Sequence, residues 1–251
     1  MTNSKKALVT GASEGIGRAF ARRLAADGYV VTVVARNEPR LKELIKDINS
    51  KDHTYYLADL STPQGTDEIA KELASTHYNL CINNAGFGTY GNFYQSDLSR
   101  LNTMIRLNCD ALVALSHAFL QNAKKGDALI NVSSALAFMP MPSAGVYSAT
   151  KAFVTSFSES LWHEQKKRGV YVMDLCPGVT ATNFHERSGG NEEDRPPAAI
   201  TQTPEEVVSV AMKALAERCC PTVVSGVKNR LITNLVRLMP RKHIVGMMAN
   251  F

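Results

Sequence analysis

The sequence has little of what metal centres and disulfide-stabilised proteins depend on. Its five cysteines form no C-x-x-C pair, and its six histidines show no metal-ligand spacing with one another or with the cysteines. Cys81 and Cys176 lie inside apolar runs, where a cysteine usually acts as a small core residue. We therefore expect neither a metal site nor a disulfide framework.

Long hydrophobic runs are also missing. The apolar stretch at residues 7–9 is too short for the core of a signal peptide, and no later stretch approaches the length of a membrane span. Apolar residues make up 45% of the 251 residues, enough for the core of one large α/β domain and too many for a disordered chain. These observations predict a soluble, cytoplasmic protein.

Acidic residues are absent from one region, residues 221–251. That region carries five basic residues: Lys228, Arg230, Arg237, Arg241 and Lys242. The whole chain has 28 basic and 23 acidic residues, so its net charge of +5 comes from this tail and the preceding residues balance. Because the charge is local and not a general basic coat, we expect no nucleic-acid partner.

Short apolar runs alternate with amphipathic helical stretches along the chain. The runs predict strands at residues 6–10, 30–35, 54–58, 80–83, 128–133, 171–175 and 222–225. Helical patterns lie between them, at about 15–27, 38–49, 64–76, 97–124, 146–168 and 204–218. This alternation indicates an α/β fold: a doubly wound parallel sheet of about seven strands, with helices on both faces, in a single domain over 1–251.

One stretch departs from this alternation. Residues 183–203 are polar, contain glycine and proline, and show no apolar period. A loop of this length in a compact domain is usually a lid or a binding segment. We expect residues 183–203 to act as a lid over the substrate, and residues 221–251 to form a basic carboxyl-terminal extension.

A glycine-rich turn joins the first predicted strand to the first predicted helix. Its glycines, Gly11, Gly15 and Gly17, allow a tight turn and a close approach of the backbone to a phosphate. The free N–H groups and the dipole of the following helix favour an anion there. We therefore expect a dinucleotide at this turn.

The end of the second predicted strand indicates which dinucleotide is bound. An NAD site would place an acid there to accept hydrogen bonds from the ribose, but the residues present are Arg36 and Asn37. Arg36 can pair with a 2′-phosphate, and Arg40 is a possible second cation. Glu14 would repel that phosphate, but the missing acid removes the NAD contact outright, so we expect NADP(H) in preference to NAD(H).

Acid–base chemistry is indicated further along the chain, by Tyr147 and Lys151. They are four residues apart on a predicted helix and share one face, so their side-chain ends can converge on one ligand. A free tyrosine is a poor base near neutrality, and a neighbouring ammonium group should lower its pKa. Ser134 ends the fifth predicted strand, and its hydroxyl can orient a substrate oxygen; Ser133 is a competitor for that role.

Together these segments resemble the short-chain dehydrogenase/reductase family over essentially the whole chain. The matching segments are TGASEGIG (10–17), Asp59-Leu60, NNAG (83–86), Asn108, Ser134, YSATK (147–151) and PGVT (177–180). Within the family, the chain is closest to the ketoacyl-reductase-like and 17β-hydroxysteroid-dehydrogenase-like branch. The resemblance implies a Rossmann-type fold and hydride transfer between nicotinamide and a carbonyl or alcohol, with Tyr147 as the acid/base.

The resemblance also assigns residues to roles. The catalytic residues would be Asn108, Ser134, Tyr147 and Lys151, with Asn108 holding a water that links Lys151 to solvent. The cofactor would contact Gly11, Ser13, Glu14, Gly15, Ile16, Gly17, Arg36, Asn37, Asp59, Leu60, Asn83, Ala85, Gly86, Tyr147, Lys151, Pro177, Gly178, Val179 and Thr180. Lys151 would bind the nicotinamide ribose, Asp59 the adenine amino group, and Val179 and Thr180 the carboxamide.

The expected substrate side is largely apolar. Its candidate lining residues are Phe87, Tyr90, Phe93, Phe138, Met139, Met141 and Phe184. No arginine or lysine is expected where a charged headgroup would need one. The expected substrate is therefore a hydrophobic ketone, aldehyde or alcohol.

Two other functions remain open from the sequence. A protein that binds NADP(H) as a redox sensor would not need the four catalytic residues, and a dehydratase or epimerase on the same fold usually has a longer chain. The basic tail could cover the active site, contact an acidic acyl carrier or an anionic membrane, or pack in an oligomer. We expect the tail to pack against its own domain or a sister subunit, and we expect no membrane contact. The resemblance implies a homodimer or homotetramer through the helices at 97–124 and 146–168.

Overall fold

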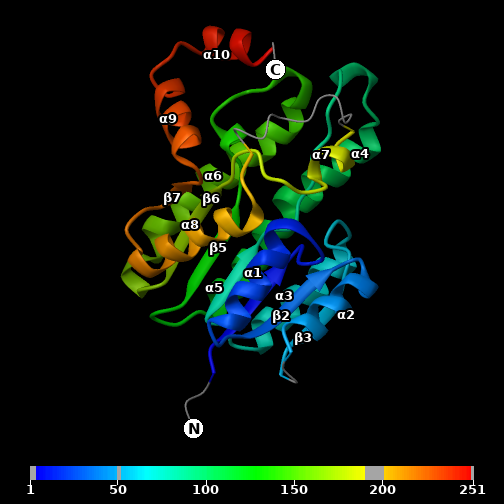
Figure 1. Ribbon diagram of the computed structural model, residues 1–251, viewed down its shortest axis with the longest axis vertical. Helices are drawn as coiled ribbons and strands as arrows, with labels where there is room; N and C mark the ends of the chain where they lie inside the picture. The colour runs from blue at the N-terminus through cyan, green and yellow to red at the C-terminus, as the bar shows by residue number, and fades with distance from the viewer. Residues whose placement is uncertain (1–3, 50–51, 190–200, 250–251) are drawn as a thin grey trace.

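A seven-stranded parallel sheet forms the centre of the protein, whose computed structural model describes residues 4–49, 52–189 and 201–249 (Figure 1). The strands are β1 (Lys6–Thr10), β2 (Val30–Ala35), β3 (Thr54–Leu57), β4 (Leu80–Asn83), β5 (Ala128–Val132), β6 (Tyr171–Cys176) and β7 (Thr222–Val224). Their order across the sheet is β3-β2-β1-β4-β5-β6-β7. The order reverses direction between β1 and β4, which is where doubly wound sheets bind ligands, beyond the carboxyl ends of the strands.

Helices cover both faces of this sheet. They are α1 (Gly15–Ala26), α2 (Glu38–Asp47), α3 (Pro63–Ser75), α4 (Leu98–Ile105), α5 (Leu112–Asn122), α6 (Gly145–Gln165), α7 (Phe184–Arg187), α8 (Pro204–Glu217), α9 (Val227–Val236) and α10 (Arg241–Met248). One apolar layer joins α1, α2 and α8 to the sheet through side chains such as Phe20 and Leu44, and the other joins α3 and α5 through Ile69 and Phe119. Each such buried side chain contributes about 1.5–3 kcal/mol.

Local sequence signals explain where several helices begin. Asn37 accepts the backbone N–H of Arg40 at 3.0 Å and caps α2. Thr203 and Glu206 form a reciprocal capping box at the start of α8, which satisfies two backbone donors at once. The helix that begins at Gly15 has no side-chain cap, so its first N–H groups stay available to an anion.

The predicted strands and helices are confirmed, with some differences at their ends. The long helix expected at 97–124 is divided into α4, a π-helical segment over Arg106–Ala111, and α5. The expected loop at 183–203 contains a short helix, α7, and its residues 190–200 lie outside the described part of the chain. π-helical turns often occur at functional sites, and this one carries Asn108.

The carboxyl-terminal region forms two further helices above the sheet. In Figure 1, α9 and α10 lie at the same end of the molecule as α7, far from the amino terminus. Val236, Ile244 and Met248 from this region pack with Ala135 and Met139, which follow β5. Across the described ranges, no helix is both long and apolar enough to cross a membrane.

Candidate active site

The turn between β1 and α1 is built for close backbone approach. Gly11 and Gly15 have φ angles of +66° and +55°, which favour glycine. A Cβ on Gly17 would lie 2.4 Å from the carbonyl oxygen of Gly11, and one on Gly11 would lie 2.9 Å from Cα of Ala85. The turn therefore fits against the segment after β4, and with the uncapped start of α1 it forms a cradle that suits a pyrophosphate.

Two residues that the sequence analysis did not single out hold this cradle together. The hydroxyl oxygen of Thr10 accepts the backbone N–H groups of Asn84 and Ala85, both at 3.0 Å. The side-chain amide of Asn84 donates to the carbonyl oxygen of Thr10, also at 3.0 Å. The signal for both was their position, one beside the glycine turn and the other inside NNAG.

The expected contact residue Asn83 faces elsewhere. Its side-chain amide donates to Ser116 at 3.1 Å and to Asn131 at 2.9 Å, inside the layer between the sheet and the helices. Only 3% of Asn83 is exposed. Its backbone is therefore the part that remains for a cofactor contact, and the side chain ties β4 to β5.

Arg36 and Asp59, expected near the adenosine, lie beside each other. A guanidinium nitrogen of Arg36 is 3.4 Å from a carboxylate oxygen of Asp59, and 62% of the Arg36 side chain is exposed. The backbone N–H and the hydroxyl of Ser61 both donate to Asp59, at 2.9 and 2.6 Å, and the bonds to Ser61 help to lower the pKa of Asp59 against the effect of its burial. Arg36 thus forms a long ion pair with Asp59, while most of its side chain stays exposed.

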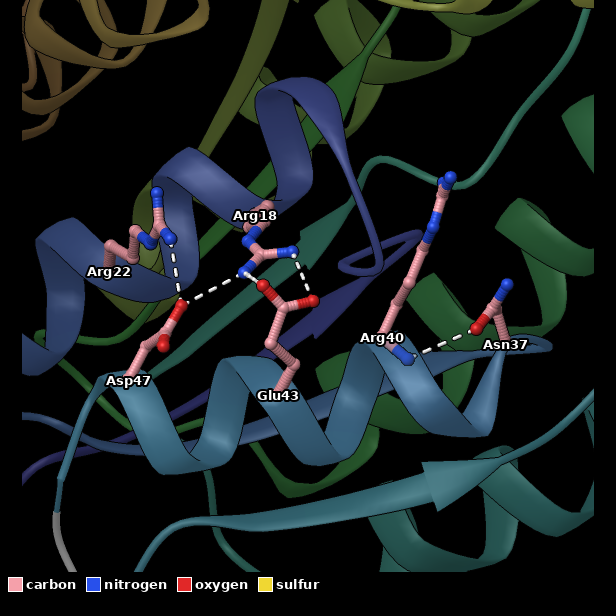
Figure 2. Close-up of polar contacts among 6 residues, drawn as sticks. All are labelled: Arg18, Arg22, Asn37, Arg40, Glu43 and Asp47. Atoms are coloured by element: carbon pink, nitrogen blue, oxygen red, sulfur yellow. Dashed lines mark hydrogen bonds and ion pairs between the residues drawn. The ribbon is translucent and has the colours of Figure 1, made fainter.

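Arg40 and Glu14 form an ion pair, so Arg40 is not a free second cation. The same carboxylate also pairs with Arg187 and accepts the side-chain amide of Asn183 at 3.3 Å. Figure 2 shows the side chain of Arg40 extending away from the start of α2, while its backbone N–H bonds to Asn37. Two arginines therefore compensate the charge of Glu14. This weakens the repulsion between Glu14 and a 2′-phosphate that the sequence analysis expects.

The four expected catalytic residues come together beyond the ends of β4 and β5. Tyr147 and Lys151 lie on α6, Asn108 on the π-helical segment, and Ser134 directly after β5. A Cβ on Gly86 would lie 3.0 Å from Oδ1 of Asn108 and 3.5 Å from Nζ of Lys151. The absence of a side chain at Gly86 therefore leaves room for the side-chain ends of Asn108 and Lys151.

Tyr147 is almost fully buried, at 7% exposure. Burial raises the pKa of its phenol, and a hydrogen bond with Ser134 lowers it by less. The expectation that Lys151 would bring the pKa of Tyr147 below its usual value is therefore wrong for this structure. Lys151 lies 5.7 Å from the centre of the Tyr147 ring and donates to the carbonyl oxygen of Val132 at 2.9 Å.

Asn108 is fixed by three hydrogen bonds. Its side chain accepts the N–H of Phe87 at 3.2 Å, donates to the carbonyl oxygen of Phe87 at 3.0 Å, and donates to Thr150 at 3.1 Å. Thr150, which the sequence analysis did not single out, in turn donates to the carbonyl oxygen of Tyr147 at 2.7 Å. Asn108 therefore couples the loop after β4 to the helix that carries Tyr147 and Lys151.

The segment after β6 carries the last of the expected cofactor contacts. Asn229 of α9 covers Gly178, because a Cβ there would lie 1.9 Å from the Asn229 amide nitrogen. The Thr180 hydroxyl donates to the carbonyl oxygen of Gly178 at 3.0 Å, and Val179 is partly exposed. Pro177 anchors the loop of Ser134, since the N–H of Ala135 donates to the Pro177 carbonyl oxygen at 2.8 Å.

The expected substrate side is apolar in most of its residues. Phe87, Tyr90, Met141 and Phe184 pack with Tyr147, and the rings of Tyr147 and Phe184 have centroids 5.5 Å apart. Phe138 and Met139 belong to a second cluster, which α9 and α10 cover. Phe93 is different: 70% of it is exposed, so it lies on the surface and not among the buried aromatics.

Two arginines lie against aromatic residues of the expected substrate side. The guanidinium of Arg100 lies 5.4 Å from the centre of the Phe87 ring, and that of Arg237 lies 4.5 Å from the centre of the Phe138 ring. Both contacts are in the range of cation–π attraction. The sequence did not reveal them, because Arg100 and Arg237 are distant along the chain from the aromatics they touch.

Similarity to known proteins agrees with this geometry. The family model for "short chain dehydrogenase" matches residues 5–193. The chain belongs to the short-chain dehydrogenase family. A 7beta-hydroxysteroid dehydrogenase of Mediterraneibacter gnavus is 30% identical over 229 residues, which cover 89% of this chain and 86% of the relative.

Other members of the short-chain dehydrogenase family are similar over most of the chain. A very-long-chain 3-oxoacyl-CoA reductase of Danio rerio is 30% identical over 220 residues, covering 84% of this chain and 67% of the relative. A short-chain dehydrogenase from Sphingobium yanoikuyae, solved in complex with NADPH, is 28% identical with a TM-score of 0.81, covering 94% of this chain and 96% of that one. This short-chain dehydrogenase is accordingly a nicotinamide-dependent oxidoreductase of CH–OH and C=O groups.

Proposed function

We propose that this short-chain dehydrogenase uses NADP(H) to interconvert an apolar ketone or aldehyde and its alcohol, with Tyr147 as the acid/base. The observation that carries the proposal is that the four side chains meet beyond β4 and β5: Asn108 and Lys151 lie against Gly86, while Tyr147 hydrogen-bonds with Ser134 and has its ring 5.7 Å from Lys151. The bound cofactor supplies the hydride. The side chains of the protein bind and orient the carbonyl and move the proton.

The preference for NADP(H) rests on Arg36. Its guanidinium is exposed, has one long contact with Asp59, and lies where an NAD site would have an acid. A planar guanidinium can form two charge-assisted hydrogen bonds with a 2′-phosphate. The similar structure from Sphingobium yanoikuyae holds NADPH, which supports the same cofactor here.

Tyr147 would donate the proton when a carbonyl is reduced. Burial keeps its phenol protonated at neutral pH, so the group starts in the form that a general acid needs. Ser134, which hydrogen-bonds with Tyr147, would hold the carbonyl oxygen beside the phenol. Lys151 and Asn108 would then return a proton to Tyr147 from solvent.

The substrate would be largely apolar, with a polar end directed toward Arg100 or Arg237. Phe87, Met141 and Phe184 favour an apolar body beside Tyr147. Arg100 and Arg237 could contact an anionic or carbonyl-bearing end of that substrate. Two of the similar proteins are named for a hydroxysteroid and for a very-long-chain 3-oxoacyl-CoA, which supports a largely apolar substrate here.

Two other features of the chain support proposals about cover and assembly. The segment around α7 would act as part of a lid, since Phe184 contacts Tyr147 and Arg187 pairs with Glu14. The outer surfaces of α4 and α6 expose apolar side chains, among them Leu98, Ile105 and Phe153. They would meet a second copy of the chain in a homodimer or homotetramer.

The first experiment measures NADPH and NADH oxidation at 340 nm with a panel of apolar ketones, aldehydes and acyl thioesters. We expect turnover with NADPH, and a loss of about 10²- to 10⁴-fold in Tyr147→Phe with NADPH binding retained. Tyr56→Phe is the control, because it also removes a tyrosine hydroxyl, but one on β3 that donates to Glu72 of α3 at 2.7 Å and has no part in the proposed reaction. Tight NADPH binding without turnover on any carbonyl would favour a redox sensor instead.

A further inference from the structure

Asp174, in the middle of β6, is a buried carboxyl group that the proposed reaction does not use. It has 0% exposure. Its Oδ2 accepts the hydroxyl of Thr155 at 2.7 Å and the thiol of Cys176 at 3.0 Å. Its Oδ1 has no hydrogen-bond partner in the part of the chain that the structure describes. A buried charge costs several kcal/mol unless a partner compensates it, so this residue needs an explanation.

Asp174 belongs to a row of polar side chains across three strands. Asn83 of β4 is in register with Asn131 of β5, and Asn131 is in register with Asp174 of β6. Partners in register point to the same face of a sheet, here the face covered by α5 and α6. Asn131 donates to Ser158 of α6 at 2.9 Å, so the two asparagines satisfy their own hydrogen bonds and leave Asp174 as the charged member.

The same face of α6 carries Lys151. Thr155, which donates to Asp174, is four residues after Lys151 and therefore lies one turn away on that face. The ammonium nitrogen of Lys151 donates to Val132, whose strand partner Leu175 directly follows Asp174. Lys151 is 5% exposed, and neither residue has an ion-pair partner within 4 Å among the described residues.

The electrostatics of the two residues are linked. Burial lowers the pKa of Lys151 to about 8, and the charge of Asp174 opposes that shift. Burial raises the pKa of Asp174, while the hydrogen bonds from Cys176 and Thr155 oppose that rise. Both bonds are donated to Oδ2, and such bonds favour the ionised form of the carboxyl group.

We propose that Asp174 is a positioning residue, whose buried carboxylate is the counter-charge that keeps Lys151 protonated at neutral pH. The kinetic effect of Asp174 rests on the proposed function. The pairing of its charge with that of Lys151 does not, because it depends only on the packing of α6 against β5 and β6. Other titratable groups face this pair: Glu159 and Tyr147 from α6, Cys176 from β6 and Cys109 from the π-helical segment. Glu159, held by the Thr222 hydroxyl at 2.6 Å, opposes the ionisation of Asp174.

The kinetic test compares the pH profiles of kcat for the wild type, Asp174→Asn and Glu159→Gln. Asparagine keeps the shape and removes the charge, so the alkaline limb of Asp174→Asn should move down by about one pH unit. Glu159→Gln removes a carboxylate one turn further from Lys151 and favours the ionised form of Asp174, so its alkaline limb should not move down. A limb in Asp174→Asn that coincides with the wild type would overturn the proposal.

A second test does not depend on turnover. Urea midpoints of the wild type, Lys151→Met, Asp174→Asn and the double variant form a cycle, and the double variant should lose less than the sum of the two single losses. This coupling should disappear at pH 10, where Lys151 is neutral, whereas a packing effect would persist. Additive losses at pH 7, or coupling that is equal at both pH values, would overturn the proposal.

The two tests separate the possible failures. Coupling at pH 7 in a protein that reduces no carbonyl would support the charge pair and refute the proposed function. If Asp174→Asn does not fold, Thr155→Val replaces it in both tests. This variant loses the hydroxyl that donates to Oδ2 at 2.7 Å, so the ionised form of Asp174 becomes less favourable while the carboxyl group stays in place. Thr155→Val should then shift the alkaline limb in the same direction by less, and an unshifted limb would count against the proposal.

Discussion

Glu14, in the glycine turn after β1, forms an ion pair with Arg187 of α7, 173 residues further along the chain. A second contact nearby supports this closure, since a Cβ on Gly15 would lie 2.9 Å from the side chain of Thr182. The segment that follows β6 therefore lies directly over the turn that suits a pyrophosphate.

Replacing Glu14 by glutamine should change cofactor exchange. The change removes one negative charge near the expected 2′-phosphate, and it releases both Arg40 and Arg187. Exposed ion pairs contribute about 0.2–1 kcal/mol each, so the binding of NADPH and the release of NADP⁺ should both become a few-fold faster. Stopped-flow measurement of cofactor fluorescence gives both rate constants.

Glu43→Gln is the matched control for Glu14→Gln. Glu43 pairs with Arg18 at 2.9 Å, and Figure 2 shows this contact between α1 and α2 beside the pair of Arg22 with Asp47. The Glu43→Gln substitution removes one negative charge, as Glu14→Gln does, but the ion pair that it breaks lies between α1 and α2 and not at α7. Equal effects of the two variants on NADP⁺ release would show that Glu14 acts only through general charge and not through Arg187.

Arg36→Ala should separate the two nicotinamide cofactors. A hydrogen bond to a charged group contributes about 1.5–3 kcal/mol, so the Kd for NADPH should rise roughly 10- to 100-fold while that for NADH changes little. Arg40→Ala should have a smaller effect on the NADPH Kd, because Arg40 is already paired with Glu14. Fluorescence titration with both cofactors measures all four values, and equal losses for NADPH and NADH in Arg36→Ala would contradict the assignment.

Much of the fold and the site could be predicted from local patterns. The alternation of apolar runs and amphipathic stretches predicted the parallel sheet, because strands buried on both faces must be apolar on consecutive positions. The four-residue spacing of Tyr147 and Lys151 predicted a shared helix face in the same way. These features depend on residues that are near one another along the chain.

The features that could not be predicted depend on contacts between distant segments. The choice between Asn83 and Asn84 depends on which way each side chain points at the end of β4, and period-two alternation alone does not reveal the role of each face. The row from Asn83 through Asn131 to Asp174 needs the strand order and register. The pKa of Tyr147 depends on how completely the chain buries it, which one sequence does not state.

The stability of the protein should also depend on pH through His53. Its Nδ1 accepts the backbone N–H of Val31 at 3.0 Å, so the folded state needs the neutral ring. Burial lowers the pKa of His53, and the unfolded chain therefore takes up a proton at a higher pH than the folded protein does. Because the unfolded state binds more protons in this range, the free energy of unfolding should fall as pH drops below about 6.5.

His53→Asn tests this dependence, because an asparagine oxygen can accept the same N–H group and does not titrate. Urea unfolding at pH 7.5 and 5.5 should show the wild type losing stability relative to the variant, by up to about 1 kcal/mol, the contribution of one buried hydrogen bond. The other ionisable groups are the same in both proteins, so their effects cancel in the difference. A difference in unfolding free energy that stays constant between the two pH values would mean that His53 keeps the same charge in the folded and unfolded states.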